Sequence, residues 1–127
     1  MSDTVTQSIR VITESFYVPD RSNPSEHRFF FAYRIQIINE GDEPAKLVRR
    51  HWVITDALGE EKEVKGEGVV GEQPYIEPGR HFEYMSACPL HTSYGTMEGA
   101  YTMRRDDGAE FEVDIGAFEL LFPHALN

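Results

Sequence analysis

Cysteine is nearly absent from this sequence, which holds a single one, Cys88, among 127 residues. One thiol cannot form an intrachain disulfide or the four-thiolate cage of a structural zinc site. A chain without disulfides is consistent with a reducing compartment. The N-terminal segment 1–7 carries neither the basic region nor the apolar region of a secretory signal. We therefore expect a cytoplasmic protein.

Long hydrophobic runs and basic residues are also scarce. No apolar run approaches the roughly 20 residues needed to span a bilayer, so we expect no membrane insertion. The chain has 12 Lys and Arg residues against 22 Asp and Glu residues, which gives a net charge of −10. This charge repels a phosphate backbone, so nucleic acid is not an expected partner. The same charge suits solubility, a basic partner or a hard cation.

What the sequence has instead is strand-like alternation along its whole length. In segment 28–39, every second residue from Phe29 to Ile37 is apolar. Successive side chains of a strand point to opposite faces, so this set is expected to face a core. No stretch of about 11 residues has apolar positions at helical spacing. The predicted strands are 5–17, 28–39, 46–56, 60–66, 80–87, 96–105 and 109–118.

These patterns predict an all-β fold, namely an immunoglobulin-like or fibronectin type III-like antiparallel β-sandwich of about seven strands. Trp52 lies on the third predicted strand, where such domains often bury a Trp. Tyr101 lies two residues before the core position Met103, as in a tyrosine corner. Coincidence in a β-rich chain is the alternative explanation. The length fits one domain, so we expect residues 1–127 to form a single domain.

Segment Gly66–Gly71 satisfies the dinucleotide-binding fingerprint G-x-G-x-x-G. That fingerprint needs a following helix whose N-terminal amides face the pyrophosphate. Here Pro74 and Pro78 favour an extended or turning chain instead, and Glu67 adds negative charge where phosphate would lie. We therefore predict a glycine-rich bulge or loop beside a strand. In the alternative interpretation, exposed loop amides hold a small anion without a helix.

The basic run Arg49-Arg50-His51 is the second candidate site. On a strand, Arg49 and His51 share one face, whereas Arg50 shares its parity with Trp52. The pattern is typical either of an anion site or of a solvated face on which Arg50 pairs with a carboxylate. We favour the second, because surface pairs between Arg and carboxylates are common.

Metal-ligating and nucleophilic patterns are sparse. Cys88 and His91 form one C-x-x-H pair, without the second pair that a closed zinc site needs. The acidic pairs Glu60-Glu61 and Asp106-Asp107 lack the calcium-loop pattern, and we interpret them as solvated turns. No G-x-S-x-G elbow occurs. We predict no cofactor, no metal site and no catalytic residue, and therefore no enzyme.

Several segments resemble the ApaG family of small bacterial proteins, also called CorD. The most specific are R-H-W-V-I-T-D at residues 50–56 and G-E-G-V-V-G-E-Q-P at residues 66–74. Further matches are Phe31-Ala32-Tyr33, Pro78-Gly79, Phe82-Glu83-Tyr84, Gly95-Thr96-Met97, Gly99-Ala100-Tyr101, Ile115, Phe118 and Leu126-Asn127. The resemblance implies a fibronectin type III-like sandwich and a link to cobalt resistance and magnesium efflux. Related domains in eukaryotic F-box proteins and in a polymerase delta-interacting protein imply a protein-interaction module. The resemblance implies no catalytic residues.

We therefore expect a non-enzymatic binding domain whose partner is an unidentified protein. The candidate surface combines strand 49–56 with segment 66–74, and its candidate residues are Arg49, Arg50, His51, Gly66, Gly68, Gly71, Gln73 and Pro74. The alternative is small-ligand binding, either of a phosphate or pyrophosphate anion at the Gly66–Gly71 loop or of a divalent cation at an acidic turn. Phe30 and Ile38 lie on a mostly polar strand face, and exposed apolar side chains of this kind are compatible with a homodimer interface.

Overall fold

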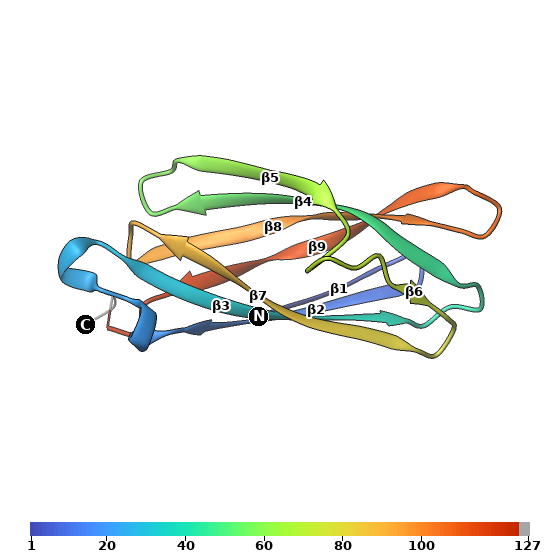
Figure 1. Ribbon diagram of the computed structural model, residues 1–127, viewed down its shortest axis with the longest axis horizontal. Coiled ribbons are helices and arrows are strands. Elements are labelled where there is room, and N and C mark those ends of the chain that lie inside the picture. Colours follow the sequence, from blue (N-terminus) through green and yellow to red (C-terminus); the bar gives the residue numbers. More distant parts are fainter. Residues whose placement is uncertain (125–127) are drawn as a thin grey trace.

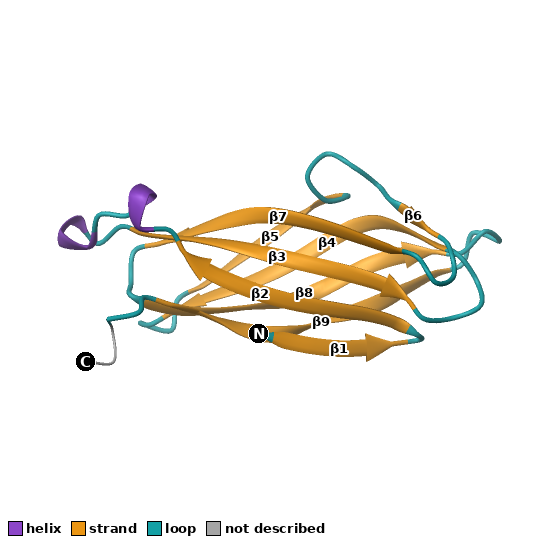
Figure 2. Ribbon diagram, turned by 90° about the horizontal axis from the view of Figure 1, so that it is seen from below, coloured by secondary structure: helices purple, strands orange, loops and turns teal. Residues whose placement is uncertain are grey.

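Two antiparallel sheets pack face to face in the computed structural model, which describes residues 1–124 (Figures 1 and 2). The four-stranded sheet has the order β1 (Ser2–Thr6), β2 (Ile9–Tyr17), β3 (Phe29–Asn39) and β7 (His81–Leu90). The five-stranded sheet has the order β5 (Glu61–Glu67), β4 (Ala45–Asp56), β8 (Tyr94–Arg104) and β9 (Glu110–Leu121), with β6 (Tyr75–Ile76) paired to the start of β4. Two short 3-10 helices, Pro19–Arg21 and Pro24–Glu26, connect β2 to β3. The predicted all-β antiparallel sandwich is confirmed.

The core forms between the sheets from the apolar parity of each strand. On β3, the side chains predicted to face inward, from Phe29 to Ile37, are all buried. Trp52 of β4 lies at the centre, where its ring meets those of Tyr33 at 5.5 Å and Phe118 at 6.0 Å between centroids, both edge to face. Aromatic pairs in this arrangement add to the stability gained by burying their area. Among residues 1–124, no helix is long and apolar enough to span a bilayer.

Residues 1–124 form nine strands where about seven were predicted. The opening segment 5–17 is a hairpin, because Gln7 and Ser8 both take positive φ, of 46° and 66°, and reverse the chain between β1 and β2. Asn and Gly usually mark such a turn, so Gln-Ser gave no signal. The other additional strand is β6, which is only two residues long. The resemblance at Leu126-Asn127 lies outside the described residues.

Of the two interpretations of Tyr101, the structure supports coincidence rather than a tyrosine corner. The Tyr101 hydroxyl is hydrogen bonded to the Tyr84 hydroxyl across the sandwich rather than to backbone upstream on its own sheet. Both rings are buried, and desolvation raises the pKa of both phenols, with Tyr101 well above the ordinary value. The pair joins β7 of one sheet to β8 of the other. Tyr101 therefore acts as a core link between the sheets.

The two long sides of the sandwich differ. On one side, β9 contacts both β1 and β2, so the sheets meet and close. Ser2 donates its hydroxyl to the Gly116 carbonyl across this junction at 2.8 Å. On the other side lie the edge strands β5 and β7, which pair within residues 1–124 only with β4 and β3 respectively. The candidate site lies along this more open side.

Candidate functional site

Antiparallel pairing of β4 with β5 brings the two predicted site segments together. Arg49, Arg50 and His51 lie opposite Glu67, Gly66 and Lys65 in the ladder. A register shift between Leu47 and Arg49 leaves Val48 as a bulge on β4, with its side chain buried. Bulges re-aim the residues beside them. The strand 49–56 and the glycine segment therefore form one continuous surface at the end of β5.

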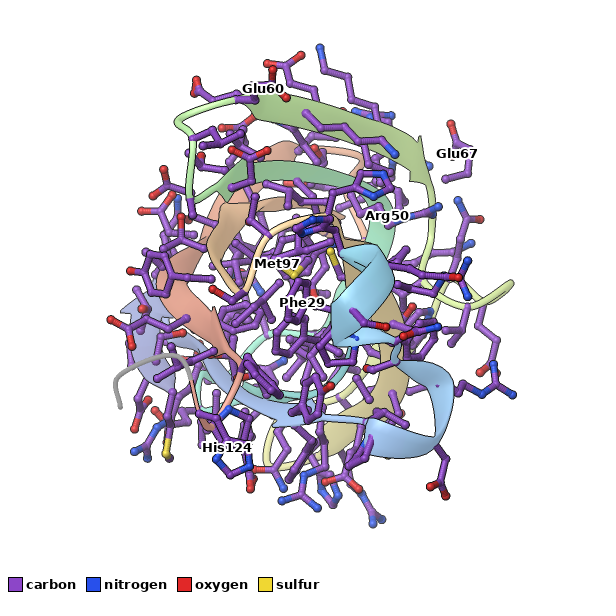
Figure 3. All side chains as sticks on the ribbon, turned by 90° about the vertical axis from the view of Figure 1, so that its left-hand side faces the viewer. Phe29, Arg50, Glu60, Glu67, Met97 and His124 are labelled. Atoms are coloured by element: carbon purple, nitrogen blue, oxygen red, sulfur yellow. The ribbon has the colours of Figure 1, made fainter. Side chains whose placement is uncertain are left out.

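Arg50 turns its side chain toward the glycine segment and bonds to backbone. Its Nη1 donates to the carbonyls of Glu67 at 2.9 Å and Gly68 at 3.0 Å. No carboxylate of residues 1–124 forms an ion pair with Arg50, so the predicted carboxylate partner is wrong for this residue. The ion pair at this site belongs to Arg49 instead, whose Nη2 lies 2.6 Å from Glu110. In Figure 3, Glu67 projects from the outer edge of β5, while Arg50 lies closer to the core.

Two of the predicted glycines lie in close contact with other groups. A Cβ at Gly66 would lie 2.8–2.9 Å from the Arg50 guanidinium, so the glycine makes room for that group. Gly68 has φ of +59°, and a Cβ there would lie 2.2 Å from the Glu72 carbonyl oxygen. Such a contact with backbone cannot be relieved by a side-chain rotation. The fingerprint glycines therefore serve the local fold of the chain.

The segment after Gly68 is a tight turn closed by its own backbone. Val69 and Glu72 exchange hydrogen bonds of 2.8 and 2.9 Å, and no helix follows. This confirms the predicted glycine-rich loop beside a strand. The Gly68 amide donates to the Val48 carbonyl at 2.9 Å. Two amides of the predicted anion loop, those of Gly68 and Val69, are therefore already engaged, as is the adjacent Glu72 amide.

Gln73 and Pro74 hold the far end of the turn against the bulge of β4. The Gln73 side-chain amide donates to the Val48 carbonyl at 3.0 Å and to the Glu67 carboxylate at 3.2 Å. The Pro74 carbonyl accepts from the Leu47 amide at 2.9 Å. Gly71 takes φ of +82° at the turn, with open space around its Cα. Gln73 and Pro74 therefore position the turn.

At the tip of the turn lies Val70, which sequence reasoning missed. Its φ is +43°, a region that β-branched residues rarely adopt, and its side chain is 53% exposed. Its neighbour Val69 is 1% exposed and anchors the turn in the core. Tyr75, just beyond, is 51% exposed and donates its hydroxyl to Asp106 at 2.9 Å. Valine has no preference for positive φ, so the sequence carried no signal for this conformation.

A shallow hollow of about 420 Å³ lies beside the turn, lined by Arg49, Arg50, His51, Lys65, Gly66, Glu67, Thr102 and Glu112. Arg49, Arg50 and Lys65 line it together with two carboxylates, Glu67 and Glu112, so the lining carries a small positive excess on a chain with a net charge of −10. The His51 Nε2 lies 3.6 Å from the Glu63 carboxylate at its edge. The hollow therefore combines cationic donors with flanking carboxylates.

The remaining sequence candidates have structural roles. Cys88 is buried, and desolvation raises the pKa of its thiol to about 11. The carboxylates of Asp106 and Asp107 accept hydrogen bonds from Tyr75 and from the Ala109 amide in the β8–β9 turn. Among residues 1–124, no three His, Cys, Asp or Glu side chains are placed to share a metal ion.

Fold and site together define the class of protein: an antiparallel β-sandwich with a rigid glycine turn beside a basic hollow. A family model described as the ApaG domain matches residues 19–105, a span that contains every candidate site residue. The chain therefore belongs to the ApaG family, and the resemblance noted in the sequence is confirmed.

Close relatives and solved structures agree with this assignment. Protein ApaG from Anaeromyxobacter dehalogenans is 51% identical, and Protein ApaG from Bdellovibrio bacteriovorus 50% identical, each over 127 residues and the full length of both chains. A crystal structure of a Bordetella pertussis protein is 45% identical with a TM-score of 0.89, covering 92% of this chain and 95% of that one. The C-terminal domain of wzt, at 10% identity and a TM-score of 0.55 over 94% of this chain and 76% of its own, shares the fold alone.

Proposed function

We propose that this protein is a non-enzymatic binding module whose partner is another protein, recognised by the turn Gly68–Pro74 and the adjoining strand β4. The observation that carries the proposal is Val70. An exposed apolar side chain in a strained conformation lies at the tip of a turn that the rest of the molecule holds in place. Backbone strain of this kind persists only where surrounding structure enforces it, and it concentrates at binding sites.

The turn is prepared for binding before a partner arrives. Arg50 and Gln73 fix its two ends through hydrogen bonds to main-chain carbonyls, and Val69 is buried beneath it. A surface that is already ordered loses little conformational entropy on association. Apolar side chains at the centre of such a surface contribute most to affinity when the partner covers them.

The test replaces Val70 at the tip of the turn and compares the effect with that of a replacement in a second exposed turn. Val70→Asn introduces a residue that tolerates positive φ and removes the apolar side chain. Leu58→Asn is the matched control, because Leu58 is 79% exposed in the Asp56–Gly59 turn. Proteins captured from native lysate by the unaltered chain are purified, and their affinity is measured for all three chains. We expect Val70→Asn to weaken binding about tenfold or more while Leu58→Asn binds normally. Equal binding by Val70→Asn overturns the proposal.

A small anion in the basic hollow is the second candidate function. Arg49, Arg50 and Lys65 line the hollow, and the engaged amides of the turn move this candidate away from the predicted loop. Titration of pyrophosphate against backbone amide NMR signals tests it. Saturable shifts at Arg49–His51 and Lys65 support anion binding, and unchanged signals at millimolar pyrophosphate remove it. A chloride titration at equal ionic strength controls for general screening.

We further propose that this protein acts in the cytoplasm and that its partner takes part in divalent-cation efflux. This would account for the family-level link to cobalt resistance and magnesium efflux. Support comes from the absence, among residues 1–124, of a side-chain group that would hold the cation directly. In a strain lacking this protein, we expect cobalt sensitivity that the unaltered chain and Leu58→Asn relieve and Val70→Asn does not. Relief by Val70→Asn separates the phenotype from partner binding at the turn.

A further inference from the structure

The open side of the sandwich contains a second feature, at the opposite end of β5 from the turn. A cleft of about 470 Å³ runs between the facing edges of β5 and β7. Apolar groups of Ile54, Val64, Cys88 and Leu90 line its floor. This volume lies in the range of small binding pockets. We propose that this cleft binds an extended peptide segment that alternates apolar and basic side chains, added as a further strand beside β5.

The walls of the cleft favour an extended chain over a compact ligand. Both walls are edge strands, and each has one hydrogen-bonding side without a strand partner within residues 1–124. An unpaired edge is a template for an incoming strand, which gains main-chain hydrogen bonds along its length. Pro89 lies on β7 and has no amide hydrogen to donate, so β5 is the better edge for an added strand.

The interior of the cleft sets the apolar half of the pattern. In the β4–β5 ladder, Ile54 lies opposite Lys62 and Trp52 lies opposite Val64, so these side chains share the inner face. Ile54 and Val64 are only half-buried, whereas Trp52 is fully buried. A strand added to β5 would direct every second side chain onto this half-covered floor.

The rim of the cleft sets the basic half of the pattern. Asp56, Glu60 and Glu61 line it against one lysine, Lys62, and one histidine, His91. The Asp56 carboxylate is bonded to the amides of its own turn, while Glu60 and Glu61 form no ion pair with any group of residues 1–124. In Figure 3, Glu60 lies at the outer rim, away from the core residues Phe29 and Met97.

The same charge argues against a second copy of this chain as the occupant. Another copy would bring its own net charge of −10 against an acidic rim. The cleft is therefore better suited to a basic partner than to self-association.

The experiment titrates short blocked peptides into the full-length protein and follows backbone amide signals. The probes are a lysine–valine alternating peptide, its glutamate–valine counterpart, and the lysine–valine peptide with alternate backbone nitrogens methylated. We expect the first to shift signals of Lys62, Val64, Ala87 and Leu90 saturably. The methylated peptide should bind about tenfold more weakly, because it cannot complete the main-chain bonds.

Protein variants test the same site from the other side. Glu60→Gln with Glu61→Gln should weaken the lysine–valine peptide about threefold or more, because two rim charges are lost. Glu98→Gln with Glu119→Gln, which removes two exposed charges from β8 and β9, is the control and should bind normally. Val64→Thr keeps the shape of the floor and should also weaken binding.

Several outcomes overturn the inference. Equal or tighter binding of the glutamate–valine peptide contradicts the charge argument, and full binding of the methylated peptide contradicts strand addition. Shifts confined to the turn Gly68–Pro74 place the peptide elsewhere. Concentration-dependent shifts at the cleft without peptide identify a second copy as the occupant. The inference does not depend on the proposed function, since Val70→Asn leaves the cleft unaltered and should bind the lysine–valine peptide normally.

Discussion

Among the residues of the turn that take positive φ, one is of a type that disfavours this conformation and another is of a type that suits it. Val70 takes positive φ although it is β-branched, and Gly68 takes positive φ within contact of the Glu72 carbonyl. The first position carries a residue that strains the backbone, and the second carries the residue that avoids strain. This contrast makes opposite predictions for substitutions only two positions apart.

Replacing Val70 should stabilise the free protein. Asn adopts positive φ more readily than Val, so Val70→Asn should raise the free energy of unfolding by about 1 kcal/mol. Urea denaturation measures the change, with Leu58→Asn as a control that should leave stability within about 0.5 kcal/mol. A loss of stability in Val70→Asn would show that the valine side chain makes a net favourable contact in the free protein.

Replacing Gly68 should have the opposite sign and a larger size. Gly68→Ala meets both the disfavoured φ and the backbone oxygen 2.2 Å from its Cβ, so we expect a loss of about 3 kcal/mol. Gly59→Ala is the matched control, because Gly59 has φ of +83° with nothing within 4 Å. It should lose only about 1 kcal/mol. Equal losses in urea denaturation would mean that the contact with Glu72 relaxes easily.

At the scale of the element, the sequence predicts the strands well and the turns unevenly. The parity of β3 from Phe29 to Ile37 follows from burial alone, because each inward position must be apolar. The pairing of Arg49–His51 with Lys65–Glu67 follows once β4 and β5 form a hairpin. The Gln7-Ser8 turn could not be predicted, since its positive φ values come from strand pairing rather than residue preference. The Val48 bulge arises from three-dimensional contacts, which no local pattern records.

The link between Arg50 and the turn can be tested by local opening. Arg50→Met keeps the unbranched stem and removes the donors to the Glu67 and Gly68 carbonyls. We expect the amides of Val69 and Glu72 to exchange with solvent about tenfold faster, with little change in the core of β3. Arg80→Met, at an exposed position in the turn before β7, is the control. Unchanged exchange at Val69 would show that the turn is held without Arg50.

For the whole molecule, the buried thiol and phenol groups of the core should make the protein less stable at high pH. Burial raises the Cys88 pKa from 9.0 to about 11, and it also raises the pKa of Tyr84 and Tyr101. The unfolded chain loses the thiol proton first, so the stabilisation is full below pH 9 and declines as pH rises toward 11. Cys88 alone should account for a loss of about 2–3 kcal/mol across that interval.

Urea denaturation at pH 8, 9 and 10 measures this decline. Cys88→Ala should be less stable at pH 8, because it leaves a small cavity, and should lose less on going to pH 10. Parallel declines in the two proteins would assign the pH dependence to the tyrosines, which titrate at still higher pH.

The junction between β1 and β9 has a kinetic consequence. The Ser2 hydroxyl meets the Gly116 carbonyl, so the β1–β2 hairpin waits for a strand that lies 114 positions further along the chain. Contacts between such distant parts of the chain form slowly, because the entropy of closing a long loop is lost before the contacts stabilise the structure. During translation, β1 and β2 can form their hairpin at once but have no cover for their inner face until β9 leaves the ribosome. The newly made chain therefore exposes an apolar surface for nearly the whole time of its synthesis.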